Sequence, residues 1–412
     1  MSHYSDRFKL GPEKNVKPLS LSTKGKKFFT YLLIASIVIL FYFASLRNFT
    51  ADENIFLRPF IVKPKPMKNI LFWSKYFGDT TWYSGSDEAG KEVLKSVECP
   101  VTNCFFTHDY NFLDNVTKFD AIAFHGPELI RNIVPLNRNQ NQIYIFVDLE
   151  APTAVRDLSE FENFFNLTMH YRLDSDIEFD YGKVVAINSV KAIAPSKNPN
   201  WMKVDEDFYD EEFLKIFEKK KKNIAWFVSH CETFSRRELL VEHMQNFTTI
   251  DIYGQCGPFK CPRFSDKCSK MLTDDYKFYL SFENSLCDDY VTEKLFNSMT
   301  EFVIPIVFNG ANMNNFLPPK SYINANDFET VEDLVDYLNF LSENPKEYIK
   351  YFWWRQYYKI LPHPVFSYAL CDICKKLNDE NFIETRHIYT DLNSWFRDKK
   401  CNQQAHIKFR NL

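Results

Sequence analysis

The sequence predicts an α/β protein with parallel sheets, on two observations. Short apolar runs of strand length occur at 70–73, 121–124 and 143–147, and again at 224–228, 249–253, 278–282 and 302–308. The chain between these runs is long enough for helices, as expected of repeated strand–helix–strand units. With 412 residues, 45% hydrophobic and 17% aromatic, the chain can bury a large core or two domains.

An apolar segment lies close to the N-terminus. Residues 28–46 carry no charge, and at about 1.5 Å per residue they can cross a hydrocarbon core of about 30 Å. Seven Lys and Arg residues precede the segment, whereas only Arg47 follows it closely. The positive-inside rule therefore predicts a cytoplasmic tail over 1–27, a transmembrane signal-anchor over 28–46 and a lumenal remainder, which is a type II topology. Residues 47–66, with three prolines, are interpreted as a stem.

The cysteines and glycosylation sequons agree with a lumenal location. All ten cysteines and all four N-x-Thr sequons follow the apolar segment. Asn115, Asn166 and Asn246 are candidate N-glycosylation sites, whereas Asn48 lies too close to the membrane. The net charge of -4 argues against a nucleic-acid-binding protein.

A domain boundary is predicted between Lys191 and Asn223. Residues 192–203 are rich in Pro, Asn and Lys, and the lysine run 219–222 is interpreted as a solvated helix end. The predicted domains are 67–195 and 196–370, followed by a C-terminal segment over 371–412.

The stretch 276–308 contains the strongest functional pattern. A strand over 278–282 delivers Glu283 and Asn284 at its carboxyl end, Thr292 is a plausible N-cap of the next helix, and 302–308 is a second strand, which requires a parallel pair. The helix start and Lys294 suit a diphosphate, and Glu293 suits the hydroxyls of a sugar. On spacing alone, an ordinary helix start with a solvated lysine fits at least equally well.

The run FYLSFENSLCDDYVTEKLFN in this stretch closely resembles the signature of the α1,3-fucosyltransferases. These inverting enzymes move L-fucose from GDP-fucose to a sugar hydroxyl. The resemblance covers about residues 70–401. It implies a GT-B-like architecture, in which two Rossmann-like domains face each other across a cleft, with the acceptor side first and the GDP-fucose side second. It also implies no organic cofactor, with Mn²⁺ or Mg²⁺ at most stimulatory.

The resemblance carries roles over to individual residues. Glu150, in the sequence DLEAPT after the strand 143–147, matches the acidic residue that deprotonates the acceptor; Asp148 is the competing carboxylate, and an ordinary loop carboxylate is the alternative. The predicted donor-binding residues are Arg237, Asn284, Tyr290, Glu293 and Lys294, with Tyr253 and Glu283 as weaker candidates. Arg236 is interpreted as a surface residue, and His230, where the family usually has Asn, receives no role.

Two other motifs receive structural interpretations. Asp174 and Asp176 form a DxD, a weak metal-binding signal, and we predict that both are structural, with Arg172 as a partner. The CxxC at Cys371 and Cys374 could hold zinc, but disulfides fit a lumenal chain better. The resemblance pairs this CxxC with Cys99 and Cys104. Disulfides are also favoured for Cys256, Cys261 and Cys268.

The acceptor prediction depends on the branch of the family. FENSLC and the late HIYTDLNSWF with Cys401 resemble the branch that fucosylates the innermost GlcNAc of N-glycans, whereas Lewis-type enzymes, which act on outer LacNAc antennae, usually have His after FENSL. The expected partners are GDP-fucose, N-glycans on glycoproteins and the Golgi membrane, with no nucleic acid. Alternatives are a Lewis-type enzyme and a non-catalytic, membrane-anchored glycan-binding protein.

Overall fold

The computed structural model describes residues 37–40, 65–79, 82, 89–262, 265–362, 366–385, 387–398 and 400–401. The chain divides into two units, Met1–Pro64 and Lys65–Leu412. In the first unit only 37–40 are described, and they are helical. The rest of the predicted transmembrane segment 28–46, and the stem as far as residue 64, lie outside the described residues. Among the described residues, no helix is long and apolar enough to cross a membrane.

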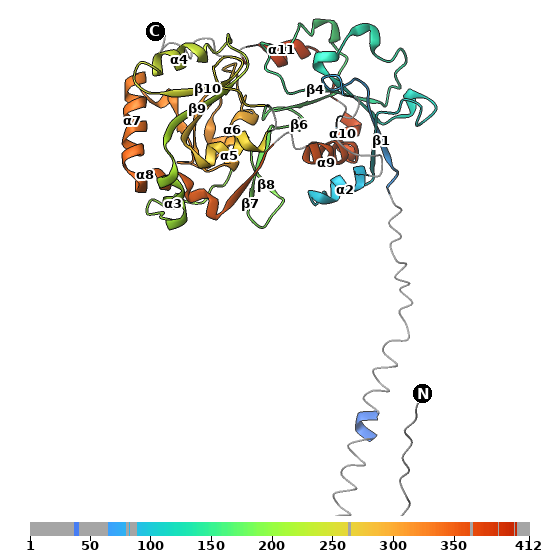
Figure 1. Cartoon of the computed structure of the whole chain (residues 1–412). Coiled ribbons are helices and arrows are strands. Elements are labelled where there is room, and N and C mark those ends of the chain that lie inside the picture. The colour runs from blue at the N-terminus through green and yellow to red at the C-terminus, as the bar shows by residue number, and fades with distance from the viewer. Residues whose placement is uncertain are drawn as a thin grey trace, which may run out of the picture. The chain divides into compact units, whose positions relative to one another are not determined.

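The first half of the second unit contains a parallel sheet in the order β2-β1-β3-β4-β5-β6. Three of its strands, β1, β4 and β6, are labelled in Figure 1. Its strands, in chain order, are β1 (Lys68–Phe72), β2 (Cys104–Thr107), β3 (Ala121–His125), β4 (Ile143–Asp148), β5 (Leu167–His170) and β6 (Ile177–Glu178). β3 and β4 are buried along their whole length, as expected of strands covered on both faces.

The second half contains another parallel sheet, in the order β10-β9-β11-β12-β13. Its strands are β9 (Lys222–Val228), β10 (Ile250–Gly254), β11 (Tyr276–Phe282), β12 (Ile304–Phe308) and β13 (Ile323–Asn324). The α/β prediction is confirmed, each of the seven predicted strands is present, and β11 and β12 pair in parallel as expected.

Helices connect these strands, and their starts follow from local sequence. The α-helices are α2 (Ala89–Ser96), α3 (Glu211–Lys219), α4 (Arg237–Met244), α5 (Asp266–Asp274), α6 (Glu293–Thr300), α7 (Val331–Glu343), α8 (Pro345–Ile349), α9 (Phe366–Leu377), α10 (Glu380–Thr385) and α11 (Leu392–Arg397). Short 3-10 helices are η1 (Val116–Lys118), η2 (Gly126–Glu128), η3 (Arg131–Ile133), η4 (Ser159–Phe161), η5 (Met313–Asn315), η6 (Ala325–Asp327) and η7 (Lys350–Gln356). Thr292 is the N-cap of α6, as predicted, and Thr330 and Asp333 form a capping box at α7.

A small antiparallel sheet joins the two halves, and one of its strands lies where the sequence predicts a linker. It contains β7 (Gly182–Ala186), β8 (Ala192–Ala194) and β14 (Tyr358–Pro362), in the order β14-β7-β8. β14 comes from the end of the second half and pairs with β7 of the first, with Ile360 opposite Val184. Sequence patterns did not reveal this sheet, because β8 has only three residues and β14 pairs with a strand that is distant in the chain.

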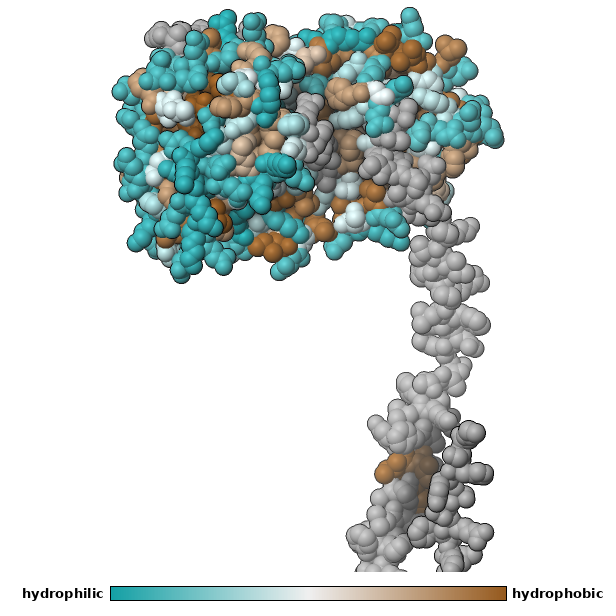
Figure 2. Space-filling model, viewed as in Figure 1, coloured by the Kyte–Doolittle hydropathy of each residue, from teal (hydrophilic) through white to brown (hydrophobic). Residues whose placement is uncertain are grey.

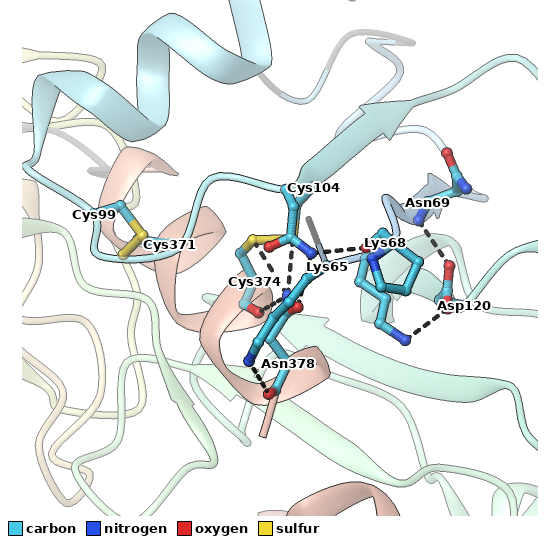
Figure 3. The surroundings of a disulfide bond; sticks show 11 residues. Lys65, Lys68, Asn69, Cys99, Cys104, Asp120, Cys371, Cys374 and Asn378 are labelled. Atoms are coloured by element: carbon cyan, nitrogen blue, oxygen red, sulfur yellow. Dashed lines mark hydrogen bonds and ion pairs between the residues drawn. A yellow bond between two sulfur atoms is a disulfide. The ribbon is translucent and has the colours of Figure 1, made fainter. Parts of the chain in front are cut away.

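The C-terminal segment returns to the first half. Disulfides join Cys99 to Cys371 and Cys104 to Cys374, so α9 is fastened beside β2, with the pairing that the resemblance implies (Figure 3). Farther along, Leu392 and Phe396 of α11 belong to a buried cluster formed largely by residues of the first sheet and its loops. Three further disulfides are Cys231–Cys256, Cys261–Cys268 and Cys287–Cys401.

The lysine run 219–222 is not simply a solvated helix end, which corrects the interpretation of its sequence. Lys220 is 5% exposed, and its Nζ donates to the carbonyl oxygens of Leu272 at 2.9 Å, Tyr276 at 2.7 Å and Thr273. Burial lowers the pKa of Lys220 to about 7. The Lys220 side chain therefore fixes the last turn of α5. Its burial is an exception among charged residues, because hydrophilic residues predominate on the surface seen in Figure 2.

Candidate functional site

The carboxyl edge of the first sheet carries two acidic residues after β4. Asp148 is fully buried, its Oδ1 accepts from the backbone N–H of Glu150 at 2.7 Å, and its Oδ2 has no partner in the described part of the chain. Burial raises the pKa of Asp148 well above its ordinary value. A Cβ at Gly126 would collide with Asp148 Oδ2, so the glycine makes room for this carboxyl group. Asp148 therefore acts as a buried support for the turn that carries Glu150.

Glu150 is the open carboxylate of this edge. Its side chain is half-buried, and no donor in the described residues bonds to its carboxylate. Burial raises the pKa of Glu150, the charge of Glu293 adds to the rise, and the charges of Lys294 and His230 oppose it. A carboxylate with a raised pKa and free oxygens can take a proton.

The loops of the two sheets meet directly. The hydroxyl oxygens of Thr153, three residues after Glu150, and Ser285, three residues after the end of β11, are 2.7 Å apart. The backbone N–H of Leu173 donates to Asp289 Oδ2 at 3.1 Å. The predicted base and the predicted donor residues are therefore brought together from distant parts of the chain.

The carboxyl edge of the second sheet contains a compact ion cluster at the start of α6. Glu283 is 1% exposed, and its Oε1 accepts from the backbone N–H of Thr292 at 2.8 Å. Lys294 Nζ lies 3.1 Å from Glu283 Oε2, 2.8 Å from Thr292 Oγ1 and 3.4 Å from Glu293 Oε1. Glu283, a weaker candidate in the sequence, is thus the group that fixes the helix start.

Charge balance in this cluster keeps Glu293 and Lys294 ionised. Burial works against ionisation of both, but the charge of Glu283 and then that of Glu293 outweigh it for Lys294, and the charge of Lys294 outweighs it for Glu293. The pKa of Glu293 is therefore lowered and that of Lys294 is raised. The Glu293 side chain stays 44% exposed, so it can also contact a ligand.

Arg237 begins α4 behind this cluster and is 3% exposed. Its Nη1 donates to the carbonyl oxygen of Phe282 at 2.6 Å, Nη2 contacts that of His230 at 3.4 Å, and Nε has no partner among the described residues. Burial lowers the pKa of the Arg237 guanidinium, against the opposing charge of Glu283. The guanidinium is held by backbone groups, which differs from the open cation that the resemblance implies.

Asn284 and Tyr290 lie at the same edge. Asn284 Oδ1 is buried with no hydrogen-bond partner in the described structure, which leaves an acceptor for a ligand. Tyr290 is 2% exposed, and its ring lies 5.0 Å from that of Tyr171 in the first half. Burial raises its pKa well above the ordinary value, and the charges of Glu283 and Glu150 add to the rise.

A cavity of about 590 Å³ opens at the carboxyl ends of β9 and β10, and one of its lining residues, His230, contacts Arg237. It is lined by Ser229, His230, Gly254, Gln255, Lys260, Cys261 and Pro262. Its volume is in the range of small-molecule sites. The sequence assigns no role to His230. Its position two residues after β9, at the carboxyl edge of a parallel sheet, is a signal that could have marked it as a site residue.

Comparisons with known proteins identify the family. Residues 217–395 match Glycosyltransferase family 10 (fucosyltransferase), C-terminal, and residues 65–182 match Fucosyltransferase, N-terminal. The chain belongs to glycosyltransferase family 10. The resemblance noted in the sequence is thereby confirmed.

Individual relatives of this family 10 chain include proteins from insects and primates. It is 41% identical to alpha-(1,3)-fucosyltransferase C of Drosophila melanogaster, over 83% of this chain and 80% of that protein. It is 32% identical to glycoprotein 3-alpha-L-fucosyltransferase A of Drosophila melanogaster, over 75% of this chain and 57% of that protein. It is also 32% identical to 4-galactosyl-N-acetylglucosaminide 3-alpha-L-fucosyltransferase FUT5 of Hylobates lar, over 81% of this chain and 80% of that protein.

Some predicted residues of this family 10 chain lie elsewhere. Tyr253 is 7% exposed, its hydroxyl contacts that of Tyr276 at 2.8 Å, and it belongs to a separate buried cluster, so the structure does not place it with Lys294.

The three glycosylation candidates differ in exposure. Asn166 is 3% exposed and its Nδ2 donates to the carbonyl oxygen of His387 at 3.0 Å. That amide nitrogen is engaged in the folded chain, and glycosylation at Asn166 stays a prediction. Asn115 and Asn246 are exposed.

Both carboxylates of the DxD have partners within the fold, and the predicted partner of Asp174, Arg172, is one of them. Arg172 forms an ion pair with Asp174, and Asp176 Oδ2 accepts from the backbone N–H of Thr168 at 2.9 Å and from Tyr389 Oη at 2.8 Å. No group of three or more His, Cys, Asp or Glu side chains with metal-site geometry occurs in the described residues.

Proposed function

We propose that the chain transfers L-fucose from GDP-β-L-fucose, in α1,3 linkage, to a GlcNAc hydroxyl at the junction of the two sheet edges. The proposal places the two halves as the facing domains of a GT-B enzyme. The observation that carries it is the position of Glu150. In a family 10 chain, the loop that carries this open carboxylate contacts the loop after β11 through Thr153 and Ser285, and the charges of Glu293 and Lys294 act on the pKa of Glu150.

The reaction is a single inverting displacement. The acceptor oxygen attacks C1 of fucose, the bond from C1 to the phosphate oxygen breaks, and the acceptor proton passes to Glu150. An alcohol is too weakly acidic to ionise near neutral pH, so a base is needed as the new bond forms. The raised pKa of Glu150 makes it a better proton acceptor than an ordinary glutamate.

The second edge receives the departing GDP. The first-turn N–H groups of α6 and the Lys294 ammonium face developing negative charge, which fixed donors stabilise without reorganisation. Arg237 adds charge behind them, and its Nη2, on a long 3.4 Å contact, is the group that can turn toward the diphosphate. Asn284 and the cavity beside His230 supply polar groups for the rest of the nucleotide. We expect Mn²⁺ or Mg²⁺ to be at most stimulatory, because these cations already face the phosphates.

For the acceptor, we propose the innermost GlcNAc of N-glycans. One relative is named a glycoprotein 3-alpha-L-fucosyltransferase, and the Cys287–Cys401 disulfide involves the cysteine that follows FENSL. The relative FUT5, named for a galactosyl-GlcNAc acceptor, represents the Lewis-type alternative. We further propose that the chain is a single-pass type II protein of the Golgi membrane with its catalytic part in the lumen.

An acceptor panel tests this proposal. Full-length protein in detergent is incubated with GDP-fucose and either a core N-glycopeptide or LacNAc, with and without EDTA, and products are analysed by mass spectrometry. We expect fucose on the reducing-end GlcNAc of the glycopeptide, with activity retained in EDTA. Transfer to LacNAc alone would favour the Lewis-type alternative. No release of GDP with any acceptor would favour a glycan-binding protein.

A further inference from the structure

The loop that carries Glu150 has little structure of its own. Residues 149–158, here called the Glu150 loop, form neither helix nor strand between β4 and η4. Inside the loop, the backbone N–H of Ala154 donates to the carbonyl oxygen of Ala151 at 2.8 Å, which closes one turn. A segment with so few backbone hydrogen bonds opens easily unless other parts of the chain hold it.

Helix α11, near the C-terminus, holds this loop from outside. Arg397 Nη2 donates to the carbonyl oxygen of Val155, and the backbone N–H of Leu158 donates to Asn393 Oδ1 at 2.9 Å. Val155 and Leu158 are buried in one cluster with Phe396 of α11, which lies beside the first sheet (Figure 1). The bond from the Arg397 guanidinium is charge-assisted, and such bonds are stronger than those between neutral groups.

The same helix packs on the strand next to β4. His170 ends β5, is fully buried and is aligned with Asp148 at the end of β4. Its ring meets those of Phe396 and Trp395 edge-on, at 5.3 Å and 5.9 Å between centroids. α11 therefore also supports the strand ends from which the Glu150 loop departs.

The chain after α11 is bonded to the other sheet edge. The carbonyl oxygen of Lys400 accepts from the backbone N–H of Asp288 at 2.6 Å, and Cys401 forms the disulfide with Cys287. Asp288 and Cys287 lie in the loop before α6. The described part of 392–401, here called the C-terminal strap, thus contacts the loops of both edges.

We propose that Arg397 is a positioning residue, which holds the Glu150 loop while Cys401 anchors the same strap to the loop before α6. This inference rests on the proposed function. Arg397 acts through the carbonyl oxygen of Val155 and not on the reacting atoms. A general base must lie within hydrogen-bond reach of the proton it takes, and a misplacement of about 1 Å can cost about 10²-fold in rate. The strap would therefore keep Glu150 at a fixed distance from the departing GDP.

The test variant is Arg397→Ala. With saturating acceptor and GDP-fucose, the single-turnover rate of transfer should fall roughly 10-fold, within the loss that a misplaced reacting group can cause. The Kd for GDP-fucose should not change, because the Cys287–Cys401 disulfide still holds the donor side. Arg397→Lys should retain most of the rate, because an ammonium can donate to the same carbonyl oxygen.

The matched control is Tyr389→Phe, in the chain that leads into α11. It removes a hydroxyl that contacts Asp176 Oδ2 at 2.8 Å and Thr168 Oγ1 at 3.1 Å, away from the Glu150 loop. Tm should fall in both Tyr389→Phe and Arg397→Ala, since each loses a hydrogen bond between the C-terminal segment and the first half. The transfer rate should fall in Arg397→Ala alone, which a general loss of stability would not produce.

Hydrogen exchange separates this inference from the proposed function. In full-length protein in detergent, peptides that cover 149–158 should exchange faster in Arg397→Ala than in the wild type, and at the wild-type rate in Tyr389→Phe. Equal exchange in Arg397→Ala and wild type, an unchanged transfer rate in Arg397→Ala, or an equal fall in the rate of Tyr389→Phe would overturn the positioning role. Faster exchange in Arg397→Ala, in a protein whose wild type transfers no fucose, would instead overturn the proposed function alone.

Discussion

The carboxyl edges of the two parallel sheets carry similar numbers of charges but arrange them differently. At the first edge Asp148 is buried with a raised pKa, and Glu150 has no partner among the described residues. At the second edge Glu283, Glu293 and Lys294 satisfy one another within 3.4 Å. The first edge is therefore suited to proton transfer, where the group must change its charge. The second suits electrostatic stabilisation, where charges must stay fixed.

The largest effect should come from removing the open carboxylate. We expect Glu150→Gln to reduce transfer by roughly 10²- to 10⁴-fold, the usual scale for loss of a general base, with nearly unchanged affinity for GDP-fucose. Single-turnover rates and GDP-fucose titration measure the two quantities. Asp148→Asn is the matched control, because the pKa of Asp148 is already well above its ordinary value. If Asp148→Asn loses transfer and Glu150→Gln retains it, the assignment of the base is wrong.

At the second edge, Lys294→Ala should lower kcat/KM for GDP-fucose by roughly 10²- to 10³-fold, the scale for one lost transition-state donor. It should also lower Tm, because the buried Glu283 would lose its cation. Steady-state kinetics and thermal unfolding measure these effects.

The control for Lys294 is Lys320→Ala, which breaks the exposed Lys320–Glu206 pair and should change neither quantity measurably. Near-normal kcat/KM in Lys294→Ala would show that the second edge does not act through this charge.

A smaller effect on the reaction is expected from removing the Cys287–Cys401 disulfide, which holds the loop before α6. Cys287 lies in the loop before α6, and its disulfide to Cys401 links that loop to the segment that follows α11. Replacing both cysteines by serine should lower Tm clearly and raise the KM for GDP-fucose a few-fold. The control pair is Cys99 and Cys371, whose disulfide closes a longer loop, with a separation of 272 residues, and lines neither the cavity nor α6. An equal KM change in the control would contradict a positioning role for Cys287–Cys401.

The smallest effect is a shift in pH dependence. The reaction needs ionised Glu150, so activity is present above its folded pKa and is lost as the pH falls through that value. Because burial raises the pKa of Glu150, the acidic limb of kcat/KM should lie above the ordinary titration range of a glutamate. The charge of His230 lowers this pKa, so His230→Asn should move the limb to higher pH. A limb that stays in place would show that His230 does not act on Glu150.

Sequence alone determined the local features of this protein. The strand runs and the Thr292 N-cap depend on neighbouring residues, and the signature FENSLCDDYVTEK is sufficient to indicate the family. The alternation of apolar residues in a strand and the choice of an N-cap residue depend on a few neighbouring positions, so both can be predicted from the sequence.

The tertiary structure decided burial and the pairing of distant segments. The contact of Thr153 with Ser285, the burial of Arg237 and Asn166, the separate cluster around Tyr253 and the return of α11 to the first sheet all join residues far apart in the chain. Such features arise from the free energy of the whole packed chain, so no local pattern encodes them.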